Sequence, residues 1–178
     1  MRVSVFCASS PTIDQKYIDL ASQLGAGIGS RGWELVSGGG RISCMGAVAR
    51  SARENGAKTI GVIPEQLVKV EFADHDSDEL IIVKDMRERK GKIESLADSF
   101  VILPGGAGTL EEFFEIWVGR FLNFHDKPIV ILDPFDLYQP LLQLIDHLER
   151  ENFVKPGQRE LLFWAHNVDQ ALDFIAQH

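Results

Sequence analysis

The chain has 178 residues and lacks the marks of several large protein classes. Its two cysteines, Cys7 and Cys44, have neither CxxC spacing nor a histidine-rich context, so we interpret both as small buried residues rather than a disulfide or metal site. No apolar run has the length of a membrane span, and the apolar part of MRVSVFCASS is too short for a signal peptide. We therefore expect a cytoplasmic protein that does not bind membranes.

Charge and motif content exclude further functions. The 26 acidic residues outnumber the 18 basic ones, and a net charge of -8 argues against a nucleic-acid-binding surface. No GK[ST] follows a glycine loop, and no loop fits GxGxxG, so triphosphate chemistry and hydride transfer are poorly supported. The chain also lacks internal repeats and low-complexity linkers, and its length and 45% hydrophobic content fit one domain over residues 1–178.

Strand-like and helix-like segments alternate along the chain. The strand-like runs are RVSVFC, WELVS, KTIGVIP, ELIIV (79–83), SFVIL (99–103) and PIVIL (128–132). Helical periodicity follows over 17–28, 45–52, 89–97, the segment after 109, 141–148 and 168–175, with Thr12–Gln15 and Asn167–Gln170 as predicted caps. This alternation predicts an α/β fold, a doubly wound parallel sheet with helices on both faces and ligands at the carboxyl ends of its strands.

Small or polar loops follow three of these strands. They are CASS (7–10), SGGGRISCMG (37–46) and PGGAGT (104–109), and their candidate ligand-binding residues are Ser9, Gly39, Gly40, Met45, Gly105, Gly106, Gly108 and Thr109. The carboxyl ends of such strands can converge on a nucleotide-sized cleft with several backbone N–H donors. The glycines could instead serve turn geometry alone, but three loops at separate strand ends favour a binding site.

The segment LPGGAGTLEE (103–112) is the most informative of the three. Its glycines allow a sharp turn, and the N–H groups at the start of the following helix form an anion site suited to phosphate. Thr109 and Glu112 also fit a capping box, which on the residues alone is the favoured role of Glu112. Glu115 lies one turn further on and could reach the same cleft or face solvent.

Other charged segments have simpler interpretations. DMRERKGK (85–92) is the densest basic run; surface charge is its default interpretation, although a bound anion would offset cations at a helix start. DHDSD (74–78) departs from the calcium-loop pattern and is predicted to be an exposed acidic loop. We expect His125, in FHDKP, to fix its loop rather than perform chemistry.

The order of five motifs resembles the LONELY GUY family of cytokinin-activating phosphoribohydrolases. These motifs are SGGG with the following MG, then GVIP, DMRERK, PGGAGTLEE and HDKP. The similarity extends roughly from Val3 to Phe153, which is most of one domain. It implies a Rossmann-like fold, a homodimer, and hydrolysis of the N-glycosidic bond of a cytokinin riboside 5′-monophosphate. The products are free base and ribose 5-phosphate, and no metal or organic cofactor is expected.

The same resemblance implies roles for individual residues. Arg89 and Glu112 form the catalytic pair, Lys90 of the same motif is a candidate substrate-binding residue, and the 105–109 loop holds the phosphate. Arginine stays protonated, so Arg89 would act electrostatically while Glu112 stabilises positive charge on the ribose. Members of this family are often labelled lysine decarboxylases, but the sequence shows no Schiff-base lysine setting and no pyridoxal phosphate signature.

Two functional alternatives stay open. One is a broad nucleosidase acting on nucleotides such as AMP, and the other is a nonenzymatic carrier of a phosphate-bearing cofactor such as the molybdenum cofactor. The presence of both Arg89 and Glu112 favours an enzyme. Many family members have glycine in place of Ser43 and a TWAQLG-like segment in place of Val118–Asn123, so base selection is expected to differ here.

A homodimer is also predicted from one helix. Phe113, Phe114, Trp117 and Phe121 give it an apolar side wider than a helix needs to cover one sheet. Burial of all four within the monomer core is the alternative. We expect a two-fold interface built partly from this helix.

Overall fold

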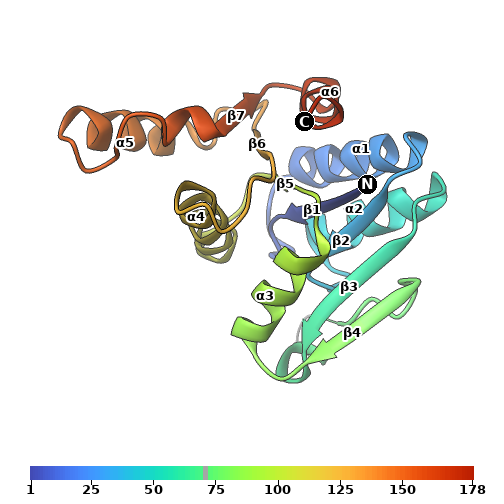
Figure 1. Cartoon of the computed structure of the whole chain (residues 1–178). Helices are drawn as coiled ribbons and strands as arrows, with labels where there is room; N and C mark the ends of the chain where they lie inside the picture. Colours follow the sequence, from blue (N-terminus) through green and yellow to red (C-terminus); the bar gives the residue numbers. More distant parts are fainter. Residues whose placement is uncertain (70–71) are drawn as a thin grey trace.

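The computed structural model describes residues 1–69 and 72–178, and within them it has seven strands, six α-helices and two short 3₁₀ helices (Figure 1). The strands are β1 (Arg2–Phe6), β2 (Glu34–Ser37), β3 (Thr59–Pro64), β4 (Glu79–Val83), β5 (Ser99–Ile102), β6 (Ile129–Leu132) and β7 (Leu162–Ala165). The helices are α1 (Gln15–Ser30), α2 (Ser43–Glu54), η1 (Glu65–Leu67), α3 (Met86–Leu96), α4 (Ala107–Phe121), α5 (Gln139–Arg150), η2 (Arg159–Leu161) and α6 (Val168–Ala176).

The strands form one sheet in the order β4-β3-β2-β1-β5-β6-β7, and every pairing is parallel. The predicted doubly wound α/β fold is therefore confirmed. Strand order reverses between β1 and β5, where the connections from the two strands lead to helices on opposite faces, α1 and α4, and leave a crevice. The edge strand β7 was not predicted, because four residues that pair only with β6 carry a weak periodic signal.

Alternate side chains of each strand enter two separate cores. Val3 and Val5 of β1 pack with α1, α2 and α6, whereas Phe6 packs with α3, α4 and α5 on the other face. Helices thus cover both faces of the sheet, and Figure 1 shows α5 projecting from the body of the molecule.

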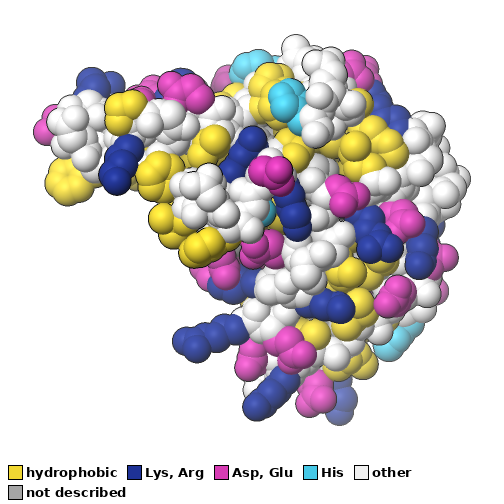
Figure 2. Space-filling view, in the orientation of Figure 1, with side chains coloured by type: hydrophobic (Ala, Val, Ile, Leu, Met, Phe, Trp, Pro, Cys, Tyr) yellow, Lys and Arg dark blue, Asp and Glu magenta, His cyan; other side chains and the backbone are white. Residues whose placement is uncertain are grey.

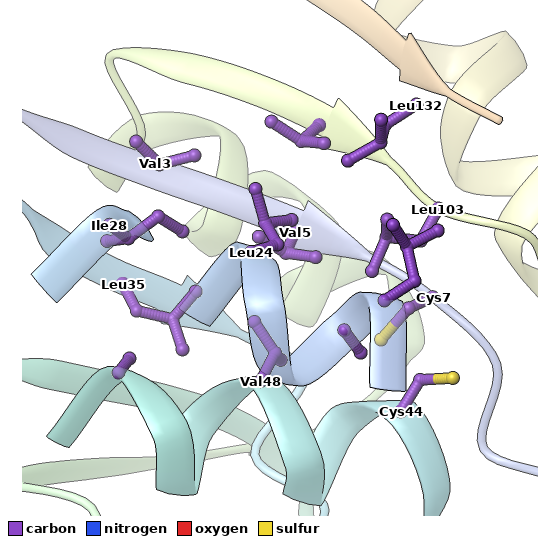
Figure 3. Close-up of a cluster of buried hydrophobic side chains, with 14 of the residues drawn as sticks. Val3, Val5, Cys7, Leu24, Ile28, Leu35, Cys44, Val48, Leu103 and Leu132 are labelled. Atoms are coloured by element: carbon purple, nitrogen blue, oxygen red, sulfur yellow. The ribbon is translucent and has the colours of Figure 1, made fainter. Parts of the chain in front are cut away.

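The first core is closed tightly by small residues. A Cβ atom on Gly25 would lie 2.3 Å from the carbonyl oxygen of Val48, and one on Gly29 would lie 2.7 Å from that of Asn55. Helices α1 and α2 therefore approach backbone to backbone, with Leu24 and Val48 between them and the sheet (Figure 3). Cys7 and Cys44 belong to this core as buried free thiols, as predicted.

Of the two helix caps predicted for α1 and α6, one is wrong and one is confirmed. The Thr12–Gln15 capping box is wrong, because α1 is capped by Asp14, whose carboxylate accepts from the Lys16 amide at 3.0 Å. The Asn167 cap is confirmed, since its side chain accepts from the Gln170 amide at 2.9 Å.

The acidic loop 74–78 is only partly exposed. Asp74 is buried and accepts from Arg53 at 2.8 Å, so the prediction of an exposed loop is wrong at this position. The pKa of Asp78 lies below its usual range, first because the Thr59 amide donates to its carboxylate. These carboxylates stabilise the loop rather than gather around one point.

Within the described residues, no helix is both long enough and apolar enough to cross a membrane. The same residues contain no group of three or more His, Cys, Asp or Glu side chains placed to hold a metal ion.

Candidate active site

A cavity of about 550 Å³ lies at the reversal point of the sheet, beyond the carboxyl ends of β1 and β5. Ligands bind at this position in open α/β sheets, and the volume falls within the range of small-molecule sites. Eight of the predicted site residues line it: Ser9, Met45, Arg89, Gly105, Gly106, Gly108, Thr109 and Glu112. The structure thus brings together residues that are up to 103 positions apart in the chain.

The glycine loop ends at the N-terminus of α4. Gly106 is the N-cap and α4 begins at Ala107, which leaves the first-turn N–H groups at the cavity. Thr109 is therefore the third residue of the helix, and the predicted Thr109–Glu112 capping box is wrong. Its side chain instead covers Gly105, where a Cβ atom would lie 2.2 Å from the Thr109 hydroxyl. Only glycine fits at position 105.

Arg89 is fixed by backbone carbonyls inside the protein. It is 4% exposed, its Nε donates to Val62 at 3.1 Å and its Nη2 donates to Gly38 at 2.8 Å. A Cβ atom on Gly38 would lie 2.0 Å from that same Nη2, so Gly38 makes room for the guanidinium. The default surface role of the basic run is wrong for Arg89, which lines the cavity.

The start of α3 tolerates its basic run because Asp85 caps the helix. The Asp85 carboxylate accepts from the Arg87 and Glu88 amides, both at 3.0 Å. These bonds are also the main reason why the pKa of Asp85 lies below its usual range. The cap satisfies amides at the helix start and offsets the cations nearby.

Glu112 and Arg89 both act on the thiol of Cys7, which also lines the cavity. The pKa of Cys7 is raised, first by burial and then by Cys44 and Glu112, while Arg89 lowers it. Cys7, Glu112 and Arg89 thus line one cavity and interact electrostatically across it. With its pKa raised, Cys7 is a protonated thiol and a poor nucleophile.

Lys90 and Glu115 lie outside the cavity lining. The Lys90 ammonium pairs with the carboxylates of Glu111 and Glu115, so it joins α3 to α4. The pKa of Lys90 is raised by these bonds, that to Glu111 first. Glu111 does line the cavity, although it was not among the predicted site residues.

Gly39 and Gly40 also lie outside the lining. Gly39 has φ of +74°, and a Cβ atom there would lie 3.2 Å from the Val62 backbone nitrogen. Turn geometry alone accounts for this glycine. Gly40 forms an isolated bridge with Ala73.

The positions at which the chain departs from the family pattern that it resembles are not part of the lining. Ser43 has φ of +55°, a left-handed conformation that explains why glycine is common there. The segment 118–123 lies at the far end of α4 from the glycine loop. A role for these residues in base selection stays a prediction that needs a partner subunit.

His125 fixes its loop, as predicted. Its Nδ1 accepts from the Lys127 amide at 3.2 Å, which leaves a proton on Nε2 to donate to the Ile116 carbonyl at 2.9 Å. The ring therefore connects the loop to α4. Burial is the main cause that lowers the pKa of His125 and favours this neutral form.

Sequence reasoning missed the apolar wall of the cavity and the support beneath its glycine loop. Ile13, Tyr17, Leu67, Met86 and Leu137 line the wall. Tyr138 lies beneath the loop, and its hydroxyl is 3.0 Å from the Gly105 carbonyl oxygen. These residues come from loops and helix ends whose side chains carry no motif, so only the fold reveals them.

Comparisons with known proteins agree with this arrangement. A family described as "Possible lysine decarboxylase" matches residues 45–175. The cytokinin riboside 5′-monophosphate phosphoribohydrolase of Mycobacterium tuberculosis is 48% identical, over 96% of this chain and 90% of that protein. The protein of the same name from Rhodococcoides fascians is 39% identical, over 97% of this chain and 88% of that protein.

A solved structure shares the fold. The molybdenum cofactor binding protein of Rippkaea orientalis aligns with a TM-score of 0.76 and 20% identity, over 99% of this chain and 95% of that one. At such identity the similarity shows the architecture alone. The sequence matches, in contrast, extend over nearly the whole chain, and they establish that it belongs to the LONELY GUY family.

Proposed function

We propose that the protein hydrolyses the N-glycosidic bond of a cytokinin riboside 5′-monophosphate, releasing the free base and ribose 5-phosphate. The observation that carries this proposal is one cavity lined by an anion-binding helix start, a buried arginine and a carboxylate. Relatives at 48% and 39% identity carry the name of this activity.

The phosphate group of the substrate is assigned to the loop 105–109. The glycine turn leaves N–H groups of the first turn of α4 at the cavity, where a dianion is stabilised by both hydrogen bonds and the helix dipole. Binding energy gained there, away from the reacting atoms, positions the scissile bond.

Glu112 is assigned the central chemical role. As the C1′–N bond breaks, its electrons go to the base and positive charge develops on the ribose. The Glu112 carboxylate stabilises that charge and orients the water whose oxygen bonds to C1′. The two protons of that water end on the new C1′ hydroxyl and on the base nitrogen, which balances the reaction.

Arg89 is assigned to polarise the leaving base and hold the nucleotide in register. Its guanidinium is fixed by the Val62 and Gly38 carbonyls, so little reorganisation is needed during the reaction. A guanidinium supplies charge rather than a proton.

A lysine decarboxylase is less well supported than a nucleosidase. A Schiff-base lysine needs a depressed pKa in a suitable pocket, whereas the pKa of Lys90 is raised by two carboxylates. In the part of the chain that the structure describes, the lining of the cavity includes no lysine.

The decisive experiment incubates the pure protein with N6-isopentenyladenosine 5′-monophosphate, AMP and the matching ribosides, and measures free base by chromatography. We expect cleavage of the isopentenyl nucleotide, because the apolar wall suits an apolar substituent, and little cleavage of either riboside. Equal rates for AMP would indicate the broad nucleosidase. Binding without any base release would indicate the carrier.

Glu112→Gln tests the catalytic assignment. The amide keeps the size of the side chain but removes its charge, so we expect turnover to fall by about 10²–10³ while the folded state is retained. Arg89→Lys is the companion variant, because charge without the planar guanidinium should also impair turnover. Retention of most of the activity in the Glu112→Gln enzyme would contradict the assignment.

We further propose a homodimer in the cytoplasm. Phe113 and Trp117 are buried within the chain, but Phe114, Val118 and Leu122 of the same helical region are 37%, 48% and 50% exposed. Hydrophobic side chains are visible at the surface over α4 and α5 in Figure 2. Sedimentation should give twice the 19.9 kDa chain mass.

The proposed cytoplasmic location is supported by the two buried free thiols, because free thiols suit a reducing compartment.

A further inference from the structure

Tyr138 stands at the junction between the sheet and α5, directly beneath the glycine loop. It is buried, and its hydroxyl oxygen lies 3.2 Å from the Leu103 carbonyl oxygen and 3.0 Å from that of Gly105. A phenol carries one proton, so the two carbonyls share it in a three-centre hydrogen bond. Both residues on either side of Pro104 are therefore held by a single side chain.

Tyr138 is itself held from below. Its backbone amide donates to the buried carboxylate of Asp133 at 2.6 Å, and Asp133 follows β6 directly. Burial raises the pKa of Tyr138, so the phenol stays protonated and acts as a donor. The support of the glycine loop thus extends from the end of β6 through Asp133 to Tyr138.

The consequence for the cavity comes from the planarity of the peptide bond. The carbonyl of Gly105 and the N–H of Gly106 belong to one peptide unit, and in a trans peptide they point in opposite directions. A Gly105 carbonyl held toward Tyr138 therefore turns the Gly106 N–H away from it. Thr109 also packs closely against Gly105, since a Cβ atom there would lie 2.2 Å from its hydroxyl.

We propose that Tyr138 is a positioning residue for the reaction, which sets the orientation of the 105–106 peptide and with it the affinity of the loop for the substrate phosphate. This inference rests on the proposed function for the identity of the substrate. It concerns binding of the phosphate group, however, and can be tested without turnover.

Tyr138→Phe removes the hydroxyl and keeps the ring. Inorganic phosphate and ribose 5-phosphate serve as probes by calorimetry, and we expect their dissociation constants to rise roughly three- to tenfold, the effect of one hydrogen bond. KM for the nucleotide should rise by the same factor, with kcat changed less than about twofold. The NMR order parameter of the Gly106 amide should fall.

Thr59→Val is the matched control. Thr59 is 1% exposed and its hydroxyl donates to Asp78 at 3.1 Å, so this variant also loses one buried hydroxyl, but at the start of β3, the strand end opposite the cavity. Its free energy of unfolding in denaturant should fall by about as much as that of Tyr138→Phe. Its affinity for both probes and the order parameter of the Gly106 amide should stay at the wild-type values.

The outcomes separate the two proposals. A wild-type protein that binds ribose 5-phosphate but releases no base contradicts the proposed function alone, and the Tyr138→Phe variant still tests the positioning role by binding. Unchanged phosphate affinity and unchanged Gly106 order in Tyr138→Phe would overturn the positioning role. Equal losses of phosphate affinity in Tyr138→Phe and Thr59→Val would also overturn it, because the loss would then follow from reduced stability in general.

Discussion

The two faces of the sheet are covered in different ways. On one face, α1 and α2 meet through Gly25 and Gly29 at backbone contact, and the core beneath them is apolar throughout. On the other face, α3, α4 and α5 bury fewer residues each, and α4 leaves Val118 and Leu122 about half exposed. The first face is closely packed beneath α1 and α2, whereas the second leaves apolar side chains of α4 exposed.

The polar machinery of the cavity comes mainly from the second face. Arg89 comes from α3, Glu112 from α4, and Tyr138 from the residue that precedes α5. Loops and helix ends at a sheet crevice can vary without disturbing a core that is closed elsewhere. We infer that the first face mainly stabilises the fold, while the second carries the proposed catalytic residues and the proposed dimer surface.

The largest effect is expected on the closed face. Gly25→Ala places a methyl group 2.3 Å from a backbone oxygen of α2, which cannot move without displacing the helix, so the free energy of unfolding should fall by at least about 2 kcal/mol. Gly91→Ala is the control in α3, because nothing lies within 4 Å of its added Cβ. Chemical denaturation should show the control stabilised by roughly 0.5–1 kcal/mol.

If both variants have the same stability, the contrast between the two faces is not one of packing. If Gly25→Ala is destabilised but retains its activity below its unfolding transition, the division between a stabilising and a functional face is strengthened.

The second effect concerns assembly. Val118→Asp adds a charge to the exposed side of α4, so a dimer that uses this face should dissociate and sediment near the 19.9 kDa of one chain. Stability of the monomer should change by only about 0.5 kcal/mol, because Val118 is exposed. Ile82→Asp, at an equally exposed position on β4, should leave the sedimentation unchanged.

The sequence predicted the fold well because apolar periodicity reports which faces are buried. Six strands and six helices were identified, and β7 was missed because Leu162–Ala165 is short and pairs on one side only. Caps were less reliable. Thr109 fits a capping pattern, but α4 already begins at Ala107. Gly106 is therefore the cap, and Thr109 lies inside the helix.

The candidate site was predictable where a backbone feature carries the function, as in the 105–109 loop. Side-chain partners were not predictable, because they depend on distances across the fold. Lys90 meets Glu111 and Glu115 from 21 and 25 positions away, and Tyr138 meets Gly105 from 33. No local pattern distinguishes such a lysine from a surface lysine, or such a tyrosine from a core tyrosine.

A third, smaller effect is expected where α3 meets α4. Lys90 compensates the charge of Glu111, a residue that lines the cavity proposed to admit a phosphate. In Lys90→Met the uncompensated carboxylates should repel the substrate and raise KM by roughly three- to tenfold, with kcat little changed. High salt should reduce the difference.

Lys92→Met is the control, because this exposed lysine lies in the same helix. Glu111→Gln in the Lys90→Met background should restore much of the affinity if the effect is electrostatic. A loss that neither salt nor Glu111→Gln corrects would mean that Lys90 contacts the substrate directly, as the resemblance to the family first suggested.

The smallest effect is a dependence of stability on pH that comes from His125, which contacts α4 on the second face. Neutral His125 holds the Ile116 carbonyl of α4 and accepts from the Lys127 amide, and burial lowers its pKa in the folded state. The unfolded chain, with an ordinary histidine pKa near 6.5, therefore binds a proton first as pH falls. The stabilisation by His125 is fully present above about pH 6.5 and is lost as pH falls toward the lower folded pKa.

His125→Asn removes this titration while retaining a polar side chain. Between pH 7.5 and 5.5, wild type should lose up to about 1 kcal/mol more of its unfolding free energy than the variant does, a bound reduced by the partial exposure of the ring. Denaturant titrations at the two pH values measure the difference. Parallel losses in both proteins would show that the attachment of α4 does not depend on the charge of His125, and that the second face differs from the first in packing alone.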